Sequence, residues 1–264
     1  MTMMRLVLEY DGTDFHGWQS QPAVRTVEGV LREALEQVTG ETPRLTAAGR
    51  TDAGAHSHGQ VVGVPLSREW QPARLSAALN AVLPDDVAVR DAEQAPGDFH
   101  ARFDALSRTY RYVVVSRRER TPLLRRFSWQ IAGDLDVAAM RTAVALFRGT
   151  HDFGAFGRSP RADGTTVRTV EHIALRRVAA PDADGTPAYV IEVSANAFLH
   201  GMMRGIAGAV VAVGRGRMSV DDIADLLAHP ESNRTVTVAP ARGLHQWSIT
   251  YQVVPDAAGT ETSA

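Results

Sequence analysis

Residues 25–40 read RTVEGVLREALEQVTG and give the clearest secondary-structure signal in the chain of 264 residues. Thr26 can cap a helix that begins here, and Gly40 can end it. The apolar residues between them recur at the spacing of one helix face, which predicts an amphipathic helix. They are Val27, Val30, Leu31, Ala34, Leu35 and Val38.

Outward from this helix, the first half of the chain is predicted to run strand, helix, strand, strand, helix, strand. The four strands are expected at residues 5–10, 43–48, 60–66 and 87–90, and the second helix at 72–82. Pro84 marks the break between that helix and the last strand.

The second half is predicted to repeat this order. We expect strands at 109–116, 167–178, 188–194 and 246–254, and helices at 137–147, 201–213 and 220–229, the last being an addition to the repeat. Two βαββαβ units in tandem indicate an α+β fold of two ferredoxin-like halves, whose mixed, mostly antiparallel sheet carries helices on one face. We place the halves at residues 1–104 and 105–254, and expect the small, polar residues 255–264 to form a disordered tail.

Composition limits the classes of function. Hydrophobic residues make up 44% of the chain, and no apolar run approaches the length that crosses a bilayer, so we expect a soluble cytoplasmic protein. The chain has no cysteine, which excludes disulfides, a thiolate nucleophile and cysteine-based metal sites.

Charge is unevenly distributed in this chain of net charge −2, and all 28 basic residues are arginines. Residues 99–126 are strongly basic, which suits binding to phosphates. The alternative is a solvated strand and loop. Eight arginines stand there against Asp104 and Glu119: Arg102, Arg108, Arg111, Arg117, Arg118, Arg120, Arg125 and Arg126.

Residues 48–56 read AGRTDAGAH and join two predicted strands. The glycines permit tight backbone geometry around Arg50 and Asp52. A carboxylate beside a guanidinium stays charged and oriented, which suits a nucleophile or a base. The alternative is an ordinary turn that contains an aspartate and a surface arginine.

Residues 196–205 read NAFLHGMMRG and lead into a helix that is apolar on nearly every face. A buried guanidinium without a carboxylate is costly, so Arg204 is expected to meet an acidic residue, and Asp52 is our candidate. The alternative is that Arg204 extends to the surface near the start of the helix.

In the strand RTYRY, residues 108–112, alternation places Arg108, Tyr110 and Tyr112 on one face and Arg111 on the other. An aromatic ring framed by arginines can stack on an unstacked base while Arg102, Arg108 and Arg111 contact RNA. The alternative is that the tyrosines pack in the core.

His56 and His58 would share a face of a strand, but no third metal ligand follows at a recognisable spacing, so no metal site is predicted. Nucleotide-binding glycine motifs are also missing. Two other readings stay open. One is an RNA-binding module without catalysis, and the other is a metal-dependent hydrolase centred on His56, His58 and His100.

Seven motifs in order resemble the tRNA pseudouridine synthase A family. They are FHGWQSQP (15–22), GRTDAGAH (49–56), NAVLP (80–84), DFHARF (98–103), RTYRY (108–112), HDFGAF (151–156) and NAFLHGMMR (196–204). The resemblance implies the pseudouridine synthase fold, and conversion of uridine to pseudouridine at positions 38, 39 and 40 of the tRNA anticodon stem and loop, without a metal or cofactor.

By the same resemblance, Asp52 attacks the flipped uridine at C6 or at C1′. Arg50 helps to extrude the uridine or fills its place, Tyr110 stacks on it and assists deprotonation at C5, and Arg204 pairs with Asp52. The resemblance also implies a homodimer in which one tRNA anticodon arm crosses both subunits. The chain departs from the usual family pattern at Ala55-His56-Ser57-His58 and at His200-Gly201, which puts substrate breadth in doubt.

Overall fold

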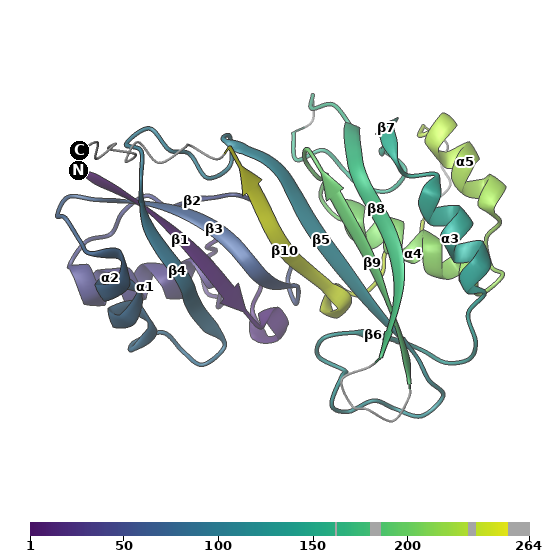
Figure 1. Ribbon diagram of the computed structural model, residues 1–264, viewed down its shortest axis with the longest axis horizontal. Helices are drawn as coiled ribbons and strands as arrows, with labels where there is room; N and C mark the ends of the chain where they lie inside the picture. The colour runs from purple at the N-terminus through teal and green to yellow at the C-terminus, as the bar shows by residue number, and fades with distance from the viewer. Residues whose placement is uncertain (162, 180–185, 232–235, 253–264) are drawn as a thin grey trace, which may run out of the picture.

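The computed structural model describes residues 1–161, 163–179, 186–231 and 236–252. Its strands form a single sheet in the order β4-β1-β3-β10-β5-β9-β8-β7, with β2 paired to β3 and β6 to β5. Figure 1 shows α1 and α2 beside the N-terminal strands, and α3, α4 and α5 beside the strands from the second half of the chain. The fold is therefore α+β with a large, mostly antiparallel sheet, as predicted.

The N-terminal half follows the predicted order of elements. Leu6 and Leu8 of β1 are fully buried in one cluster with Leu31 and Leu35 of α1, because alternation in the strand and the helical spacing both present an apolar face. Thr26 caps α1 by accepting a hydrogen bond from Gly29 N. The elements are β1 (Thr2–Tyr10), α1 (Val27–Thr39), β2 (Thr46–Ala47), β3 (His56–Leu66), α2 (Pro72–Asn80) and β4 (Val87–Ala95).

The second half repeats this arrangement with additions. Its strand order β10-β5-β9-β8 matches the order β4-β1-β3-β2 of the first half. The repeated elements are β5 (Ala105–Ser116), α3 (Val137–Ala145), β8 (Val167–Ala179), β9 (Pro187–Ala195), α4 (Met202–Gly214) and β10 (Leu244–Tyr251). The additions are β6 (Trp129–Ile131), β7 (Gly149–Asp152), α5 (Val220–Ala228) and two short 3-10 helices, η1 (Gly12–Asp14) and η2 (Ala241–Gly243).

The main differences from the predicted elements are in short strands. The strand predicted at 43–48 is reduced to two residues, because only Thr46 and Ala47 pair in register with β3 before the chain turns into the next loop. β6 and β7 were not predicted, since three or four residues are too few for a periodic pattern. Residues 253–254 of the last predicted strand and the predicted tail, 255–264, lie outside the described residues.

β10 joins the two halves into one sheet (Figure 1). It runs antiparallel to β5 along most of its length, but pairs in parallel with β3 only at His245↔His56 and Gln246↔Ser57. We call this two-residue junction the seam. Side chains reinforce it, because the imidazoles of His56 and His245 stack with centroids 4.8 Å apart and Ser57 Oγ donates to Gln246 Oε1 at 3.1 Å.

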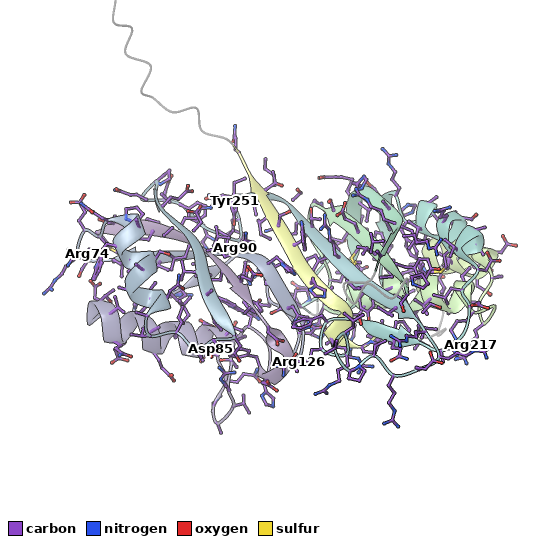
Figure 2. All side chains as sticks on the ribbon, turned by 60° about the horizontal axis from the view of Figure 1, so that its bottom comes forward. Arg74, Asp85, Arg90, Arg126, Arg217 and Tyr251 are labelled. Atoms are coloured by element: carbon purple, nitrogen blue, oxygen red, sulfur yellow. The ribbon has the colours of Figure 1, made fainter. Side chains whose placement is uncertain are left out.

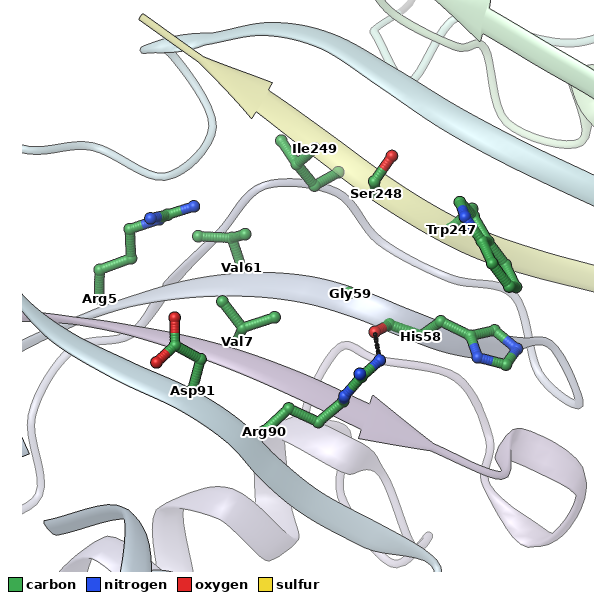
Figure 3. Close-up of a pocket in the computed structure, with 10 residues that line it drawn as sticks. All are labelled: Arg5, Val7, His58, Gly59, Val61, Arg90, Asp91, Trp247, Ser248 and Ile249. Carbon is green, nitrogen blue, oxygen red and sulfur yellow. Dashed lines mark hydrogen bonds between the residues drawn. The ribbon is translucent and has the colours of Figure 1, made fainter. Parts of the chain in front are cut away.

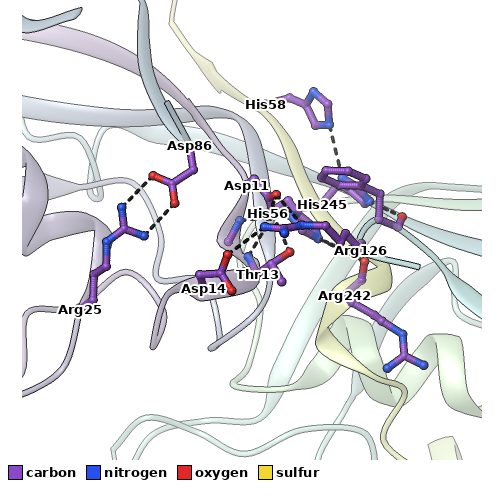
Figure 4. Close-up of polar contacts among 12 residues, drawn as sticks. Asp11, Thr13, Asp14, Arg25, His56, His58, Asp86, Arg126, Arg242 and His245 are labelled. Atoms are coloured by element: carbon purple, nitrogen blue, oxygen red, sulfur yellow. Dashed lines mark hydrogen bonds and ion pairs between the residues drawn. The ribbon is translucent and has the colours of Figure 1, made fainter. Parts of the chain in front are cut away.

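The loop between β5 and β6 crosses over the seam and is fastened there (Figure 4). Arg126 forms ion pairs with Asp11 and Asp14, and its carbonyl accepts a hydrogen bond from His56 Nε2 at 2.8 Å. The carbonyl of Phe127 accepts from His245 Nε2 at 2.9 Å. Figure 2 shows Arg126 in the middle of the molecule, where a loop of the second half meets the first half.

Burial favours the neutral form of the seam histidines. Gly12 N donates to His56 Nδ1 at 3.1 Å and Nε2 faces the Arg126 carbonyl, an arrangement that favours the ring proton on Nε2, although Asp11 Oδ1 also lies 3.2 Å from Nδ1. His58 lies beside them, with Nε2 3.3 Å from His245 Nδ1. Burial lowers the pKa of His56 and the pKa of His58, and lowers the pKa of His245 to about 3.

We predict that acid weakens this seam. An unfolded histidine takes up its proton near pH 6.5, whereas His245 in the folded chain does not until about pH 3. Its contribution to stability is therefore complete above pH 6.5 and falls as the pH drops below that value, by up to about 1.4 kcal/mol per pH unit. Urea unfolding of the wild type and of His245→Gln at pH 7.5, 6.5 and 5.5 should show a smaller pH dependence for the variant.

The control is His229→Gln, which changes a histidine whose side chain is 70% exposed and which ends α5, the helix that Figure 1 shows well apart from β10. This control should keep the pH dependence of the wild type. If His245→Gln also keeps it, the neutral, buried state of His245 does not govern acid stability.

Candidate active site

A cleft of about 620 Å³ opens where the two halves of the chain meet. The first half contributes the loop at residues 48–52, and the second half contributes β5 and the start of α4. The cleft therefore depends on the seam, because neither half supplies the whole wall. Asp52, Arg50, Tyr110 and Arg204 all line it.

The loop that carries Asp52 packs against the loop after β1 and is hydrogen-bonded to it. Trp18 N donates to the Thr51 carbonyl at 3.1 Å, and the Thr51 hydroxyl lies 2.8 Å from Tyr10 Oη. Gly17 has φ +88° and lies so close that a Cβ there would come within 2.7 Å of the Thr51 carbonyl oxygen. Thr51 is consequently buried and fixes the position of the neighbouring Asp52.

Asp52 and Arg204 form an ion pair across the cleft, with Arg204 Nη1 2.8 Å from Asp52 Oδ2. Their side chains are 15% and 23% exposed, in the order Asp52 and Arg204. Arg204 Nε also donates to the Ala239 carbonyl at 2.7 Å, so the guanidinium is fixed at two points. Arg204, which lies in an apolar helix, thus has a carboxylate partner, and that partner is Asp52.

The second oxygen of Asp52 faces a residue that the sequence did not single out as a site residue. His200 Nδ1 lies 3.5 Å from Asp52 Oδ1, and its imidazole is 64% exposed. The backbone of His200 is held by two hydrogen bonds with Arg158. The only feature of the sequence that could have indicated a role for His200 near Asp52 was its position four residues before Arg204. No guanidinium among the described residues binds Asp52 Oδ1, and Asp52 lines the cleft.

Tyr110 supplies an aromatic wall. It is 8% exposed, and its ring meets that of Phe198 edge-on with centroids 4.7 Å apart. Gln246 Nε2 donates to its hydroxyl at 3.5 Å. Burial raises the pKa of Tyr110 to about 12, an effect that the charge of Arg108 opposes and the charge of Asp52 reinforces. Tyr110 is therefore a protonated phenol at neutral pH.

Arg50 and Arg102 are exposed at the rim of the cleft. The guanidinium of Arg50 makes no hydrogen bond or ion pair with the residues that the structure describes. That of Arg102 lies 5.7 Å from the ring centroid of Phe103. Both side chains are free to meet a ligand that enters from solvent.

Arg108 differs from the arginines at the rim, because its guanidinium donates to four backbone carbonyls. Nη1 binds those of Ala105 and Asn196 at 2.9 and 2.8 Å, and Nη2 binds those of Ala48, at 3.4 Å, and Arg102. These carbonyls belong to separate segments around the cleft. Arg108 therefore clamps the cleft together, and the predicted contact of its guanidinium with RNA would have to compete with those bonds.

Arg111 lies on the opposite face of β5, as alternation predicted. Its Nε is 2.6 Å from Glu192 Oε2, and its guanidinium stacks 3.6 Å from the ring of Trp247. Trp247 lines a second hollow, of about 320 Å³, on this helix-free face (Figure 3). The structure therefore does not bring Arg111 to the Asp52 cleft.

The three histidines of the alternative hypothesis, a metal-dependent hydrolase, do not lie together. His56 and His58 lie at the seam, whereas His100 lines the cleft. No group of three or more histidine, aspartate or glutamate side chains in the described ranges is arranged to hold a metal ion. Within the same ranges, none of the helices has the length and apolar character needed to span a bilayer.

Comparison with known proteins gives a consistent result. A family model described as tRNA pseudouridine synthase matches residues 6–104 and 143–252. The tRNA pseudouridine synthase A of Roseiflexus sp. (strain RS-1) is 41% identical over 264 residues, covering 100% of this chain and 96% of that protein. Proteins of the same name from Chloroflexus aurantiacus (strain ATCC 29366) and Geotalea daltonii are 43% and 37% identical, each over 95% of this chain and over 89% and 100% of their own lengths.

The clamp formed by Arg108 predicts a loss of stability on conservative replacement. Arg108→Lys should lower the free energy of unfolding by about 1–3 kcal/mol, because one ammonium group cannot reach four carbonyls and leaves some of them unsatisfied. Arg102→Lys, at an exposed position, should change it by less than about 0.5 kcal/mol. Urea unfolding measures both variants, and equal effects would contradict the clamp.

Proposed function

Because the chain belongs to the tRNA pseudouridine synthase family, we propose that the cleft around Asp52 is the place where it isomerises uridine to pseudouridine in tRNA. The observation that carries this proposal is the arrangement of Asp52 in the cleft that Tyr110 also lines, with one carboxylate oxygen bound to Arg204 and the other bound by no guanidinium among the described residues. The reaction breaks the C1′–N1 bond and forms a C1′–C5 bond, while C5 loses its proton to solvent and N1 gains one. It needs no oxidant or reductant.

The target uridine must leave its stack to reach Asp52, at a cost of a few kcal/mol. A cleft of about 620 Å³ falls within the size range of small-ligand sites and can receive one nucleotide. Arg50 lies at the rim with no partner among the described residues, and we propose that it helps to extrude the uridine or fills the space that the uridine leaves.

Asp52 is proposed as the nucleophile. Arg204 compensates its charge and holds Oδ2, so Oδ1 is the oxygen that attacks, either at C6 of the base or at C1′ of the ribose. Attack at C1′ displaces N1 as the Asp52–C1′ bond forms, whereas attack at C6 gives an adduct from which the C1′–N1 bond then breaks. In either route the base turns, C5 bonds to C1′ and the bond to Asp52 breaks, which frees the carboxylate. His200 lies near Oδ1 and helps to orient it.

Tyr110 is proposed to pack against the uracil ring. Its raised pKa of about 12 means that it holds its proton at neutral pH, so it cannot act as a free phenolate. It can assist deprotonation at C5 only by passing on its own proton as it accepts the one from carbon. The Asp52 carboxylate can accept the phenolic proton once it is released from the nucleoside. It is close enough for its charge to raise the pKa of Tyr110.

The finer assignments are also proposals. We propose that the substrates are uridines 38, 39 and 40 of the anticodon arm, and that Arg102 adds contacts to RNA outside the reacting base. A homodimer would let a chain of net charge −2 assemble a longer basic surface from two sets of arginines, and sedimentation equilibrium tests its mass. We also propose that the protein acts in the cytoplasm, and a tRNA substrate supports this proposal.

Asp52→Asn should remove catalysis without removing binding. The amide keeps the shape of the carboxylate but is a poor nucleophile, so release of tritium from tRNA labelled at C5 of uridine should fall at least about 1,000-fold. The Kd for tRNA should stay within a few-fold of the wild type. The matched control is Asp91→Asn on the helix-free face, which should react normally. Wild-type turnover by Asp52→Asn would refute the nucleophile assignment.

The position of modification is tested separately. After incubation of unmodified tRNA with the purified protein, mass-spectrometric mapping should find pseudouridine at positions 38, 39 and 40 and at no other uridine. Pseudouridine outside the anticodon arm would reject the proposed specificity while leaving the reaction itself established.

A further inference from the structure

An exposed aromatic ring stands at the rim of the cleft. Phe103 is 70% exposed, yet it lines the same cleft as Asp52 and Tyr110. Tyr110 is itself 8% exposed and lies at the wall. Trp18 and Phe198 also line the cleft, but neither is exposed as Phe103 is. The role proposed above for the flipped uridine uses the ring of Tyr110 and leaves the exposed ring of Phe103 without a partner base.

The exposure of Phe103 is built into its loop. His100 Nδ1 accepts hydrogen bonds from the backbone N–H groups of Arg102 and Phe103 at 3.2 and 3.4 Å, and His100 N donates to Asp104 Oδ2 at 2.7 Å. Ala101 is fully buried beneath the loop. A turn with this many internal bonds fixes the backbone of Phe103, and with it the direction in which the side chain leaves the chain.

The same loop is tied to the sheet on both sides. Tyr251 Oη donates to the Ala101 carbonyl at 2.6 Å, and Arg108 Nη2 donates to the Arg102 carbonyl. Arg108 also binds the Ala48 carbonyl at the start of the Asp52 loop. The position of Phe103 is thus fixed relative to the loop that carries Asp52.

Cationic and aromatic groups flank the exposed ring. The imidazole of His100 lies 4.3 Å from it, centroid to centroid, and the guanidinium of Arg102 lies 5.7 Å from its centroid. An exposed ring beside a guanidinium is the combination by which proteins hold an unpaired base and its phosphate. An apolar protein partner would not need the cation.

We propose that Phe103, flanked by His100 and Arg102, is a second stacking site that holds a base adjacent to the flipped uridine. This inference rests on the proposed function, since it requires RNA in the cleft. Extrusion of one uridine leaves each neighbouring base without a stacking partner on one side. The ring of Phe103 takes the place of the extruded uracil beside one of these bases. Because every base has a π face, the site tolerates any neighbouring base and serves more than one target position.

The test compares Phe103→Ala, Phe103→Leu and Phe103→Trp in tritium release and in tRNA binding. Loss of the ring should raise KM and Kd about 5- to 150-fold, the range expected for base–aromatic stacking, with a smaller change in kcat. Phe103→Leu should behave like Phe103→Ala, because it keeps apolar bulk without a π face. Phe103→Trp should restore binding.

The matched control is Leu106→Ala, at a nearby apolar side chain that is 56% exposed and does not line the cleft. It should leave KM and Kd unchanged. Equal thermal unfolding midpoints for all variants would show that the effects are not losses of folding.

A direct readout uses tRNA that carries 2-aminopurine on either side of the target uridine, bound to the chain in an Asp52→Asn background. Stacking on Phe103 should quench one of the two labels, and Phe103→Leu should abolish that quenching. Quenching of neither label, or full binding by Phe103→Leu, would overturn the stacking site. Tritium release by the wild type separates this failure from failure of the proposed function, which would leave even the wild type inactive.

Discussion

The insertion of β10 between β3 and β5 is the constraint on which the rest of the structure depends. Its parallel pairing with β3 covers only two residue pairs, so buried side chains and the crossing loop complete the junction. Asp52 comes from one side of this junction and Arg204 from the other. Their ion pair at 2.8 Å therefore depends on the joining of the two halves into one sheet, since each half alone carries only part of the wall of the cleft.

Much of the fold could be predicted from local patterns. The helix at α1 has a cap, an apolar stripe and a terminal glycine, and each agrees with the observed element. The repeated order of elements led to two similar halves, and the sheet order repeats accordingly. Strand neighbours at the seam could not be predicted, because Ser57 and Gln246 meet across 189 residues and no local pattern encodes a parallel contact of two residues.

The site was predictable where burial limited the choices. A guanidinium in an apolar helix needs a carboxylate, and that requirement led from Arg204 to Asp52. For Arg108 the sequence showed a charge, but it could not show that backbone carbonyls from separate segments would converge on it. His200 was also not identified as a neighbour of Asp52, because its proximity to Oδ1 comes from tertiary packing of the segment before α4.

The place of β10 in the chain has a consequence for synthesis. It is translated after all the other strands of the described sheet, so a growing polypeptide on the ribosome exposes the edges of β3 and β5 until residues 244–251 emerge. Asp52 is made early but meets Arg204 late, and a nascent chain beside translating tRNAs would stay inactive until the sheet closes.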